Sequence, residues 1–290
     1  MEEHDEKYVC SCSTYIKRKR VICEEGEIME KIDVSIFASS VRPQLYKEFF
    51  KSLEGTTVNY EVVFAGNKEL SEIVPYNTTH SWKYIKTENI KPAQCYEIAR
   101  RHCSGELISW TADDALYPFD CIGKAYRFWK ERNNEKLILS LITKERYNKT
   151  YFLTDLNVHT LRGPGTPLMA PFALMSREYL ERLGGIDRRY ICGQYENDIV
   201  MRIYEDGGEL VQFKDAPIVV DHYVGHGGVT TVEGYNRPFG QGYPHDRKIL
   251  EGSWIKDGVV SKTRLDPVEK FEDQDILTKS QSFNLERMWQ

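Results

Sequence analysis

The chain has 290 residues, a mass of 33.8 kDa and a formal net charge of −5. This length fits one large α/β domain or two small ones, and a composition of 41% hydrophobic and 29% charged residues is typical of neither a disordered chain nor an integral membrane protein. The net acidity argues against a general nucleic-acid binder, whose affinity comes from neutralising phosphates. We find no stretch of roughly 18–20 apolar residues that would span a bilayer and no signal-peptide pattern at the start, so we expect a cytoplasmic protein, with peripheral membrane contact left open.

The first thirty residues differ in texture from the rest, and we interpret residues 1–30 as an N-terminal extension. They contain Cys10, Cys12 and Cys23, whose spacing lacks the C-x₂-C pairs typical of zinc sites, so the role of these thiols stays open. Seven cysteines without a secretory signal indicate reduced thiols rather than a disulfide framework. We expect one domain over residues 31–250 and a C-terminal tail over residues 251–290.

From residue 31 onward, short apolar runs alternate with amphipathic segments. For example, Leu45, Phe49 and Leu53 lie four residues apart and form one apolar helix stripe. The expected strands cover residues 34–38, 61–65, 107–111, 136–143 and 217–220, and the expected helices cover residues 45–53, 92–103, 121–129, 176–183 and 197–206. This alternation predicts an α/β fold with a largely parallel sheet covered by helices on both faces. Such sheets bind ligands at the carboxyl ends of their strands.

Two adjacent acids, Asp113 and Asp114, directly follow the apolar strand at residues 107–111. Neighbouring carboxylates repel each other unless a cation or hydrogen-bond donors offset their charges, and carboxylate oxygens suit Mg²⁺ or Mn²⁺. The alternative is that one of the two acids caps the helix that starts near Pro118. The dipeptide alone does not decide between these interpretations.

Three later motifs provide context: a Gly-Gly-x-Asp loop at residues 184–187, an acidic helix start at residues 195–202, and a strand that ends in Asp221-His222. Together with the segment from Gly105 to Asp114, their order and spacing resemble the family 2 glycosyltransferases, over roughly residues 31–226. The resemblance implies the GT-A fold, a Rossmann-like α/β fold with a mixed, mostly parallel sheet. It also implies a hexosyltransferase-like enzyme that uses a nucleotide-diphosphate sugar.

The resemblance places Asp114 on the metal-binding acid of the family's DxD motif and His222 on a histidine that contacts the metal or the diphosphate in some members. It therefore implies a divalent metal cofactor, Mn²⁺ or Mg²⁺. Ala112 stands where the first acid of the motif usually lies, which shifts the ribose-facing role to Asp113. A lone histidine at a strand end is also commonly structural, and His226 is a second, weaker candidate ligand.

The same resemblance places Glu196 on the position of the catalytic base, with Asp198 as the other candidate. Side chains two residues apart on a helix point roughly 200° apart, so both cannot face one substrate if both are helical. For the donor site, Asn67 stands where many members carry an acid that reads the uracil base. Arg42 and Lys91 are candidates to meet the diphosphate, although a charge at such a position is more often simply solvated.

The resemblance implies a metal-dependent, inverting transfer of a sugar from a nucleotide-diphosphate sugar to an acceptor hydroxyl. We expect the acceptor to be a glycan, lipid or protein, without nucleic acid as a partner. Two alternatives stay open. A non-catalytic protein of the same fold that binds sugar or nucleotide would explain Ala112 and the missing uracil acid. A sugar-1-phosphate nucleotidyltransferase is disfavoured because the loop at residues 38–43 contains no glycine. The glycine-punctuated residues 225–242 are a candidate lid.

Overall fold

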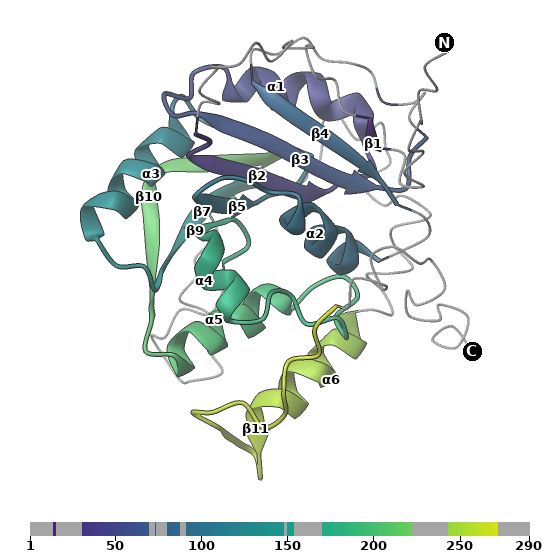
Figure 1. Cartoon of the computed structure of the whole chain (residues 1–290), viewed down its shortest axis with the longest axis vertical. Helices are drawn as coiled ribbons and strands as arrows, with labels where there is room; N and C mark the ends of the chain where they lie inside the picture. The colour runs from purple at the N-terminus through teal and green to yellow at the C-terminus, as the bar shows by residue number, and fades with distance from the viewer. Residues whose placement is uncertain are drawn as a thin grey trace, which may run out of the picture.

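The computed structural model describes residues 14–15, 31–69, 73, 80–87, 91–147, 150–153, 170–221 and 243–271 (Figure 1). Several residues named above lie outside this part of the chain. They are Cys10, Cys12, Cys23, His222, His226 and the candidate lid at residues 225–242.

The strands, in chain order, are β1 (Thr14–Tyr15), β2 (Val34–Ser39), β3 (Tyr60–Gly66), β4 (Ser81–Lys86), β5 (Leu107–Trp110), β6 (Ala115–Leu116), β7 (Leu137–Tyr147), β8 (Thr150–Leu153), β9 (Ala173–Ser176), β10 (Glu209–Asp221), β11 (Ile255–Lys256) and β12 (Val259–Val260). The helices are the short 3₁₀ helix η1 (Pro43–Leu45), α1 (Tyr46–Leu53), α2 (Pro92–Arg101), α3 (Cys121–Arg132), α4 (Arg177–Arg182), α5 (Tyr195–Glu205) and α6 (Tyr243–Trp254).

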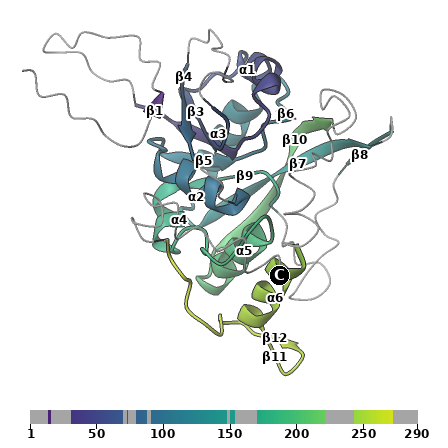
Figure 2. The same ribbon diagram turned by 90° about the vertical axis from the view of Figure 1, so that its right-hand side faces the viewer.

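Within the described residues, ten strands form one mixed sheet in the order β1-β4-β3-β2-β5-β9-β7-β10-β6, with β8 paired to β7. The strand pairings give β4, β3, β2, β5, β7 and β10 one direction, and β1, β9, β6 and β8 the opposite direction. The sheet is therefore mostly parallel, as predicted. Strands β7 and β8 form an arm that extends away from the middle of the sheet (Figure 2).

Helices cover both faces of the sheet, which confirms the predicted fold class. Helices α1 and α3 pack on one face, and α2, α4, α5 and α6 pack on the other (Figure 1). Alternate side chains of β2 enter the two cores, with Ile36 in one and Phe37 in the other. Burial on both faces explains why the central strands are continuous apolar runs in the sequence.

The main differences from the sequence-based expectation lie in the last third of the chain. Helix α5 begins at Tyr195 rather than at residue 197, and β10 begins at Glu209, well before residue 217. The register of β10 against β7 shifts between Phe213 and Ile218, so the polar residues in between interrupt the apolar pattern without ending the strand. Helix α6 was not predicted, and it runs past the expected domain boundary at residue 250.

Residues 261–271, here called the C-terminal strap, return from α6 towards α2 (Figure 1). The backbone N–H of Leu265 donates to the carbonyl oxygen of Ser253 at 2.9 Å, and the N–H of Arg188 donates to that of Glu269 at 2.9 Å. Phe271, at the end of the strap, is buried. In the part of the chain that the structure describes, no helix has the length and apolar character needed to cross a membrane.

Candidate active site

The acid pair and Arg42 meet at one edge of the sheet. Strands β2 and β5 are neighbours and run parallel, so the loops that follow them leave the sheet side by side. Asp113 is buried, and its Oδ2 accepts hydrogen bonds from Ser40 Oγ at 2.9 Å and from the backbone N–H groups of Val41 and Arg42, both at 3.0 Å. These donors stabilise a charged carboxylate away from water and fix the loop at residues 40–42 to the end of β5.

The guanidinium of Arg42 holds both acids. Its Nε donates to Asp113 Oδ1 at 2.8 Å, its Nη2 forms a short contact with the same oxygen, and its Nη1 donates to Asp114 Oδ2 at 2.9 Å. One planar cation therefore offsets the repulsion between two neighbouring carboxylates. The sequence singled out all three residues but did not predict that they pair with one another.

This arrangement supplies only part of a divalent-cation site. Both oxygens of Asp113 already accept hydrogen bonds, Asp114 Oδ2 faces the guanidinium of Arg42, and Ala112 offers no ligand. No group of three or more His, Cys, Asp or Glu side chains in the described residues is placed to hold a metal ion. A metal at Asp114 would compete with Arg42 for Oδ2 and would need a further ligand, and the expected one, His222, lies outside the described residues.

Glu196 lies in the first turn of α5, and its Oε2 atom is buried without a hydrogen-bond partner among the described residues. Burial raises the pKa of Glu196 to about 7, and the negative charge of Asp246 adds to this effect. The backbone N–H groups of Glu196 and Gln194 act in the opposite direction. A carboxyl group with a pKa near neutrality is suited to accept a proton during a reaction.

Asp198, the other candidate base, is fully buried and bonded on both oxygens. Its Oδ2 accepts from Arg202 Nε at 2.9 Å, and its Oδ1 accepts from Trp254 Nε1 at 2.9 Å, with Arg264 Nε at 3.3 Å from the same oxygen. These contacts join α5 to α6 and to the C-terminal strap. Asp198 is thus bonded on both oxygens, whereas Glu196 keeps one carboxyl oxygen without a hydrogen-bond partner among the described residues.

Tyr96 of α2 connects the acid pair to the start of α5, and sequence reasoning missed it. Its hydroxyl donates to the carbonyl oxygen of Thr111 at 2.6 Å, directly ahead of the acids. Its ring lies against that of Tyr195 at a centroid distance of 5.4 Å, one residue before Glu196. The position of Tyr96 in the apolar pattern of α2 gave no sign of this contact, because the pattern records burial and not the partner.

The remaining predicted residues occupy different surroundings. Lys91 precedes α2 and is buried, and burial lowers its pKa to about 8 while the charge of Asp246 opposes that change. Asn67 is exposed directly after Gly66, whose backbone lies against the carbonyl oxygen of Ser40. Lys91 therefore lies on the Glu196 side of the site, whereas Asn67 lies beside the loop that carries Arg42.

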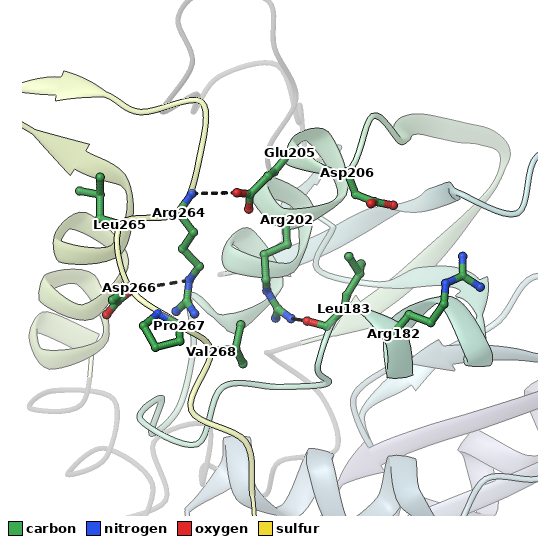
Figure 3. A pocket seen from close by; sticks show the side chains of 10 residues that line it. All are labelled: Arg182, Leu183, Arg202, Glu205, Asp206, Arg264, Leu265, Asp266, Pro267 and Val268. Atoms are coloured by element: carbon green, nitrogen blue, oxygen red, sulfur yellow. Dashed lines mark hydrogen bonds and ion pairs between the residues drawn. The ribbon is translucent and has the colours of Figure 1, made fainter.

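A separate cleft of about 560 Å³ opens between α4, the end of α5 and the C-terminal strap (Figure 3). Glu205, the last residue of α5, lines this cleft, whereas Glu196 lies in the first turn of the helix, about 13.5 Å away at 1.5 Å per residue. Arg182, Arg202 and Arg264 contribute positive charge to it, and Glu205, Asp206 and Asp266 contribute negative charge. None of the residues that line this cleft belongs to the acid pair or its loop, so the cleft is distinct from the site around the acid pair.

The mixed sheet, the two helical layers and the polar residues at the strand ends define an α/β protein with a GT-A-like, Rossmann-like fold. Similar solved structures include S. aureus TarS 1–349, with a TM-score of 0.54 and 14% identity over 66% of this chain and 61% of that chain. TarS 1–349 in complex with UDP has a TM-score of 0.53 and 14% identity over 78% and 76% of the two chains. TarS 1–349 in complex with UDP-GlcNAc has a TM-score of 0.51 and 13% identity over 66% and 58%.

The similarity to these structures is one of fold, and the chain spans about three fifths of the length of the first and last of the three. No protein-family model and no curated protein sequence matches the chain.

Proposed function

We propose that the chain is a glycosyltransferase of the family 2 type that moves a sugar from a nucleotide-diphosphate sugar to an acceptor hydroxyl with inversion. The observation that carries this proposal is the carboxyl group of Glu196, which has a pKa near neutrality and whose Oε2 atom is buried without a hydrogen-bond partner among the described residues. Tyr96 connects its helix to the strand end with the acid pair. The similar fold of TarS, solved with UDP and with UDP-GlcNAc, supports a nucleotide sugar as the donor.

In the proposed reaction, deprotonated Glu196 accepts the proton of the acceptor hydroxyl as that oxygen attacks the anomeric carbon. The bond from the sugar to the diphosphate breaks, and its electron pair leaves with the diphosphate. The buried surroundings of Glu196 keep its pKa close to neutral pH, so the group is deprotonated often enough to act and still basic enough to accept a proton.

On the donor side, Asp113 holds the loop at residues 40–42 and Arg42 presents a guanidinium at the same strand ends. A guanidinium suits the oxygens of a diphosphate, and Asn67 lies beside this loop as a candidate contact for the base. Metal dependence, with Asp114 and His222 as ligands, belongs to this proposal through the family resemblance alone. A bound metal would supply charge stabilisation for the departing diphosphate.

The direct test is to incubate the full-length protein with a panel of nucleotide sugars, with Mn²⁺ or with EDTA. The released nucleoside diphosphate is measured with a luminescence assay. We expect at least one donor to be hydrolysed slowly or transferred, and Glu196→Gln to reduce that rate by about 100-fold or more while nucleotide binding is kept. Asp198→Asn is the comparison variant, because removing the carboxylate of Asp198 should lower the stability of the fold rather than act directly on the reaction. Full activity in Glu196→Gln would contradict the assignment of the base.

A non-catalytic protein that binds sugar or nucleotide is the second candidate. It is favoured by Ala112 in place of an acid and by the pairing of Arg42 with both remaining acids. A thermal-shift panel separates the two candidates, because a binder and an enzyme are both stabilised by a nucleotide sugar but only an enzyme consumes it. Stabilisation by UDP-GlcNAc without any turnover would favour the binder.

A further inference from the structure

Asp246, in the first turn of α6, is a buried carboxylate bonded to three successive backbone N–H groups. Its Oδ1 accepts from Ile191 at 2.9 Å, and its Oδ2 accepts from Cys192 at 2.8 Å and from Gly193 at 2.9 Å. Successive N–H groups that converge on one carboxylate form a strong anion-binding turn. A residue of α6 thus fixes a loop that lies more than fifty positions earlier in the chain.

This loop leads directly into the helix that carries Glu196. After Gly193, the backbone takes a left-handed conformation at Gln194, with a φ of 62°, and α5 begins at Tyr195. The carbonyl oxygen of Ile191 also accepts from the N–H of Ala93 at 3.0 Å, so the start of α2 holds the same turn. The direction in which α5 leaves the loop, and hence the place of Glu196, depends on this turn.

Helix α6 holds α5 at a second point. Trp254 Nε1, near the end of α6, donates to Asp198 Oδ1 at 2.9 Å, and Trp254 is itself fully buried. Asp246 therefore contacts the turn that precedes Glu196 in the chain, and Trp254 contacts Asp198, two positions after Glu196. Movement of α6 would displace the candidate base.

The charged and titratable groups around Glu196 form one buried cluster. It contains Asp246 from α6, Lys91 from the start of α2, and the thiol of Cys192 from the turn. Burial raises the pKa of Asp246, although its three N–H donors oppose that change. Burial also raises the pKa of Cys192, with Asp246 and Glu196 adding to the effect, so this thiol stays neutral. The cluster holds two carboxyl groups and one lysine.

We propose that Asp246 is a positioning residue for Glu196. Asp246 holds the turn at residues 191–193 through its three hydrogen bonds, and it places a second negative charge near the base. The inference rests on the proposed function only in naming Glu196 as the base. The hydrogen bonds from the turn at residues 191–193 to Asp246 are a property of the folded chain and exist with or without turnover.

The test is a carboxyl ¹³C NMR titration of the full-length protein labelled at Glu and Asp, with the signal of Glu196 assigned through Glu196→Gln. We expect Asp246→Asn to lower the titration midpoint of Glu196 by about 0.5 units or more, because a nearby negative charge is removed. Asp120→Asn is the matched control. Asp120 is a buried acid bonded to the N–H of Thr57 at 2.9 Å, and it packs on the opposite side of the sheet.

A second measurement keeps the test decisive if Asp246→Asn does not fold. In the wild type, the backbone N–H groups of Ile191, Cys192 and Gly193 each donate to Asp246, so we expect these amides to exchange their hydrogens far more slowly than amides of exposed loops. An unchanged midpoint of Glu196 in folded Asp246→Asn, or unprotected amides at residues 191–193 in the wild type, would overturn the proposal.

Kinetics separate this inference from the proposed function. In an active enzyme, we expect Asp246→Asn to shift the acid limb of the kcat profile to lower pH and to reduce kcat by about tenfold at its plateau, with a smaller change in KM. Asp246→Glu, which keeps the charge, should leave the acid limb closer to that of the wild type. A coupled titration without any sugar transfer would leave the positioning role standing and would refute the function.

Discussion

At the scale of single residues, the protonation of Glu196 is linked to stability. Its pKa is about 7 in the folded chain, above the usual 4.5, so the folded state binds the proton more tightly than the unfolded state. Stability from this group is therefore full below about pH 4.5 and falls as the pH rises through 7, by up to about 3 kcal/mol. Deprotonation, which the proposed reaction needs, has a cost in stability.

We accordingly expect Glu196→Gln to raise the urea midpoint of unfolding at pH 8 and to change it little at pH 5. The neutral amide avoids the buried charge that the wild type must carry at high pH. Urea denaturation of both proteins at the two pH values, with the exposed Glu48→Gln as the control, measures the effect. An equal difference at pH 5 and pH 8 would show that the charge of Glu196 is not involved.

Arg42 provides a second prediction, because its guanidinium and a divalent cation would compete for Asp114. We expect Arg42→Gln to bind Mn²⁺ about tenfold more tightly than the wild type, as measured from the free Mn²⁺ signal in electron paramagnetic resonance. Arg247→Gln, which removes an arginine from an exposed ion pair with Glu251, is the matched control. Equal affinity in the wild type and in Arg42→Gln would mean that Arg42 does not occupy the cation position.

At the scale of elements, the end of β3 lies close to the loop after β2. A Cβ atom on Gly66 would lie 1.8 Å from the carbonyl oxygen of Ser40, so the backbone of one strand would have to shift. We expect Gly66→Ala to lower the free energy of unfolding by about 1–3 kcal/mol or more, and to weaken nucleotide binding through the displaced loop. Equilibrium urea denaturation and nucleotide titration measure both effects.

Gly252 of α6 is the control position for Gly66→Ala. A Cβ atom there would meet nothing within 4 Å, and alanine is favoured over glycine within a helix. Gly252→Ala should therefore stabilise the protein by about 0.5–1 kcal/mol. A similar loss in both variants would show that the close approach of Gly66 to Ser40 has no special importance.

The sequence predicted the elements whose signal is local. Strand β2, helix α1 and strand β3 each carry a complete apolar pattern within a few residues, and they form close to the predicted positions. Helix α6 was missed because it is held by contacts with distant parts of the chain, which no local sequence pattern records. Trp254 contacts α5, and Asp246 contacts the turn at residues 191–193.

The same distinction applies to the candidate site. The acids after β5 and Glu196 are part of compact motifs that can be read directly from the sequence. The pairing of Arg42 with Asp113 spans 71 residues, and the hydrogen bond from the N–H of Ile191 to Asp246 spans 55 residues. No local pattern encodes these contacts, because they depend on how the strands and helices are ordered in space.

At the scale of the whole molecule, the C-terminal strap supplies charge to the interior. Arg264 is almost fully buried, its Nη2 donates to Asp187 Oδ2 at 2.7 Å, and its Nε lies 3.3 Å from Asp198 Oδ1. Arg264 also lines the cleft beside α5 (Figure 3). Two buried acids from different elements thus share a cation that lies outside the domain expected from the sequence.

We therefore expect the strap to unfold together with the rest of the chain. Arg264→Gln should lower the free energy of unfolding by about 2–4 kcal/mol, because Asp187 and Asp198 would each lose a charged partner while staying buried. Arg189 and Arg202 still pair with these acids, which limits the loss. The exposed Lys248→Gln serves as the control.

Urea denaturation, monitored by tryptophan fluorescence, measures this loss of stability. Circular dichroism at the same urea concentrations shows whether both signals report a single unfolding transition. If residues 251–290 were an independent tail, Arg264→Gln would unfold at the wild-type urea concentration. A single transition shifted to lower urea would place the strap within the folded domain. The proposed base would then be held by two segments beyond its own motif, α6 through Asp246 and Trp254, and the strap through Arg264.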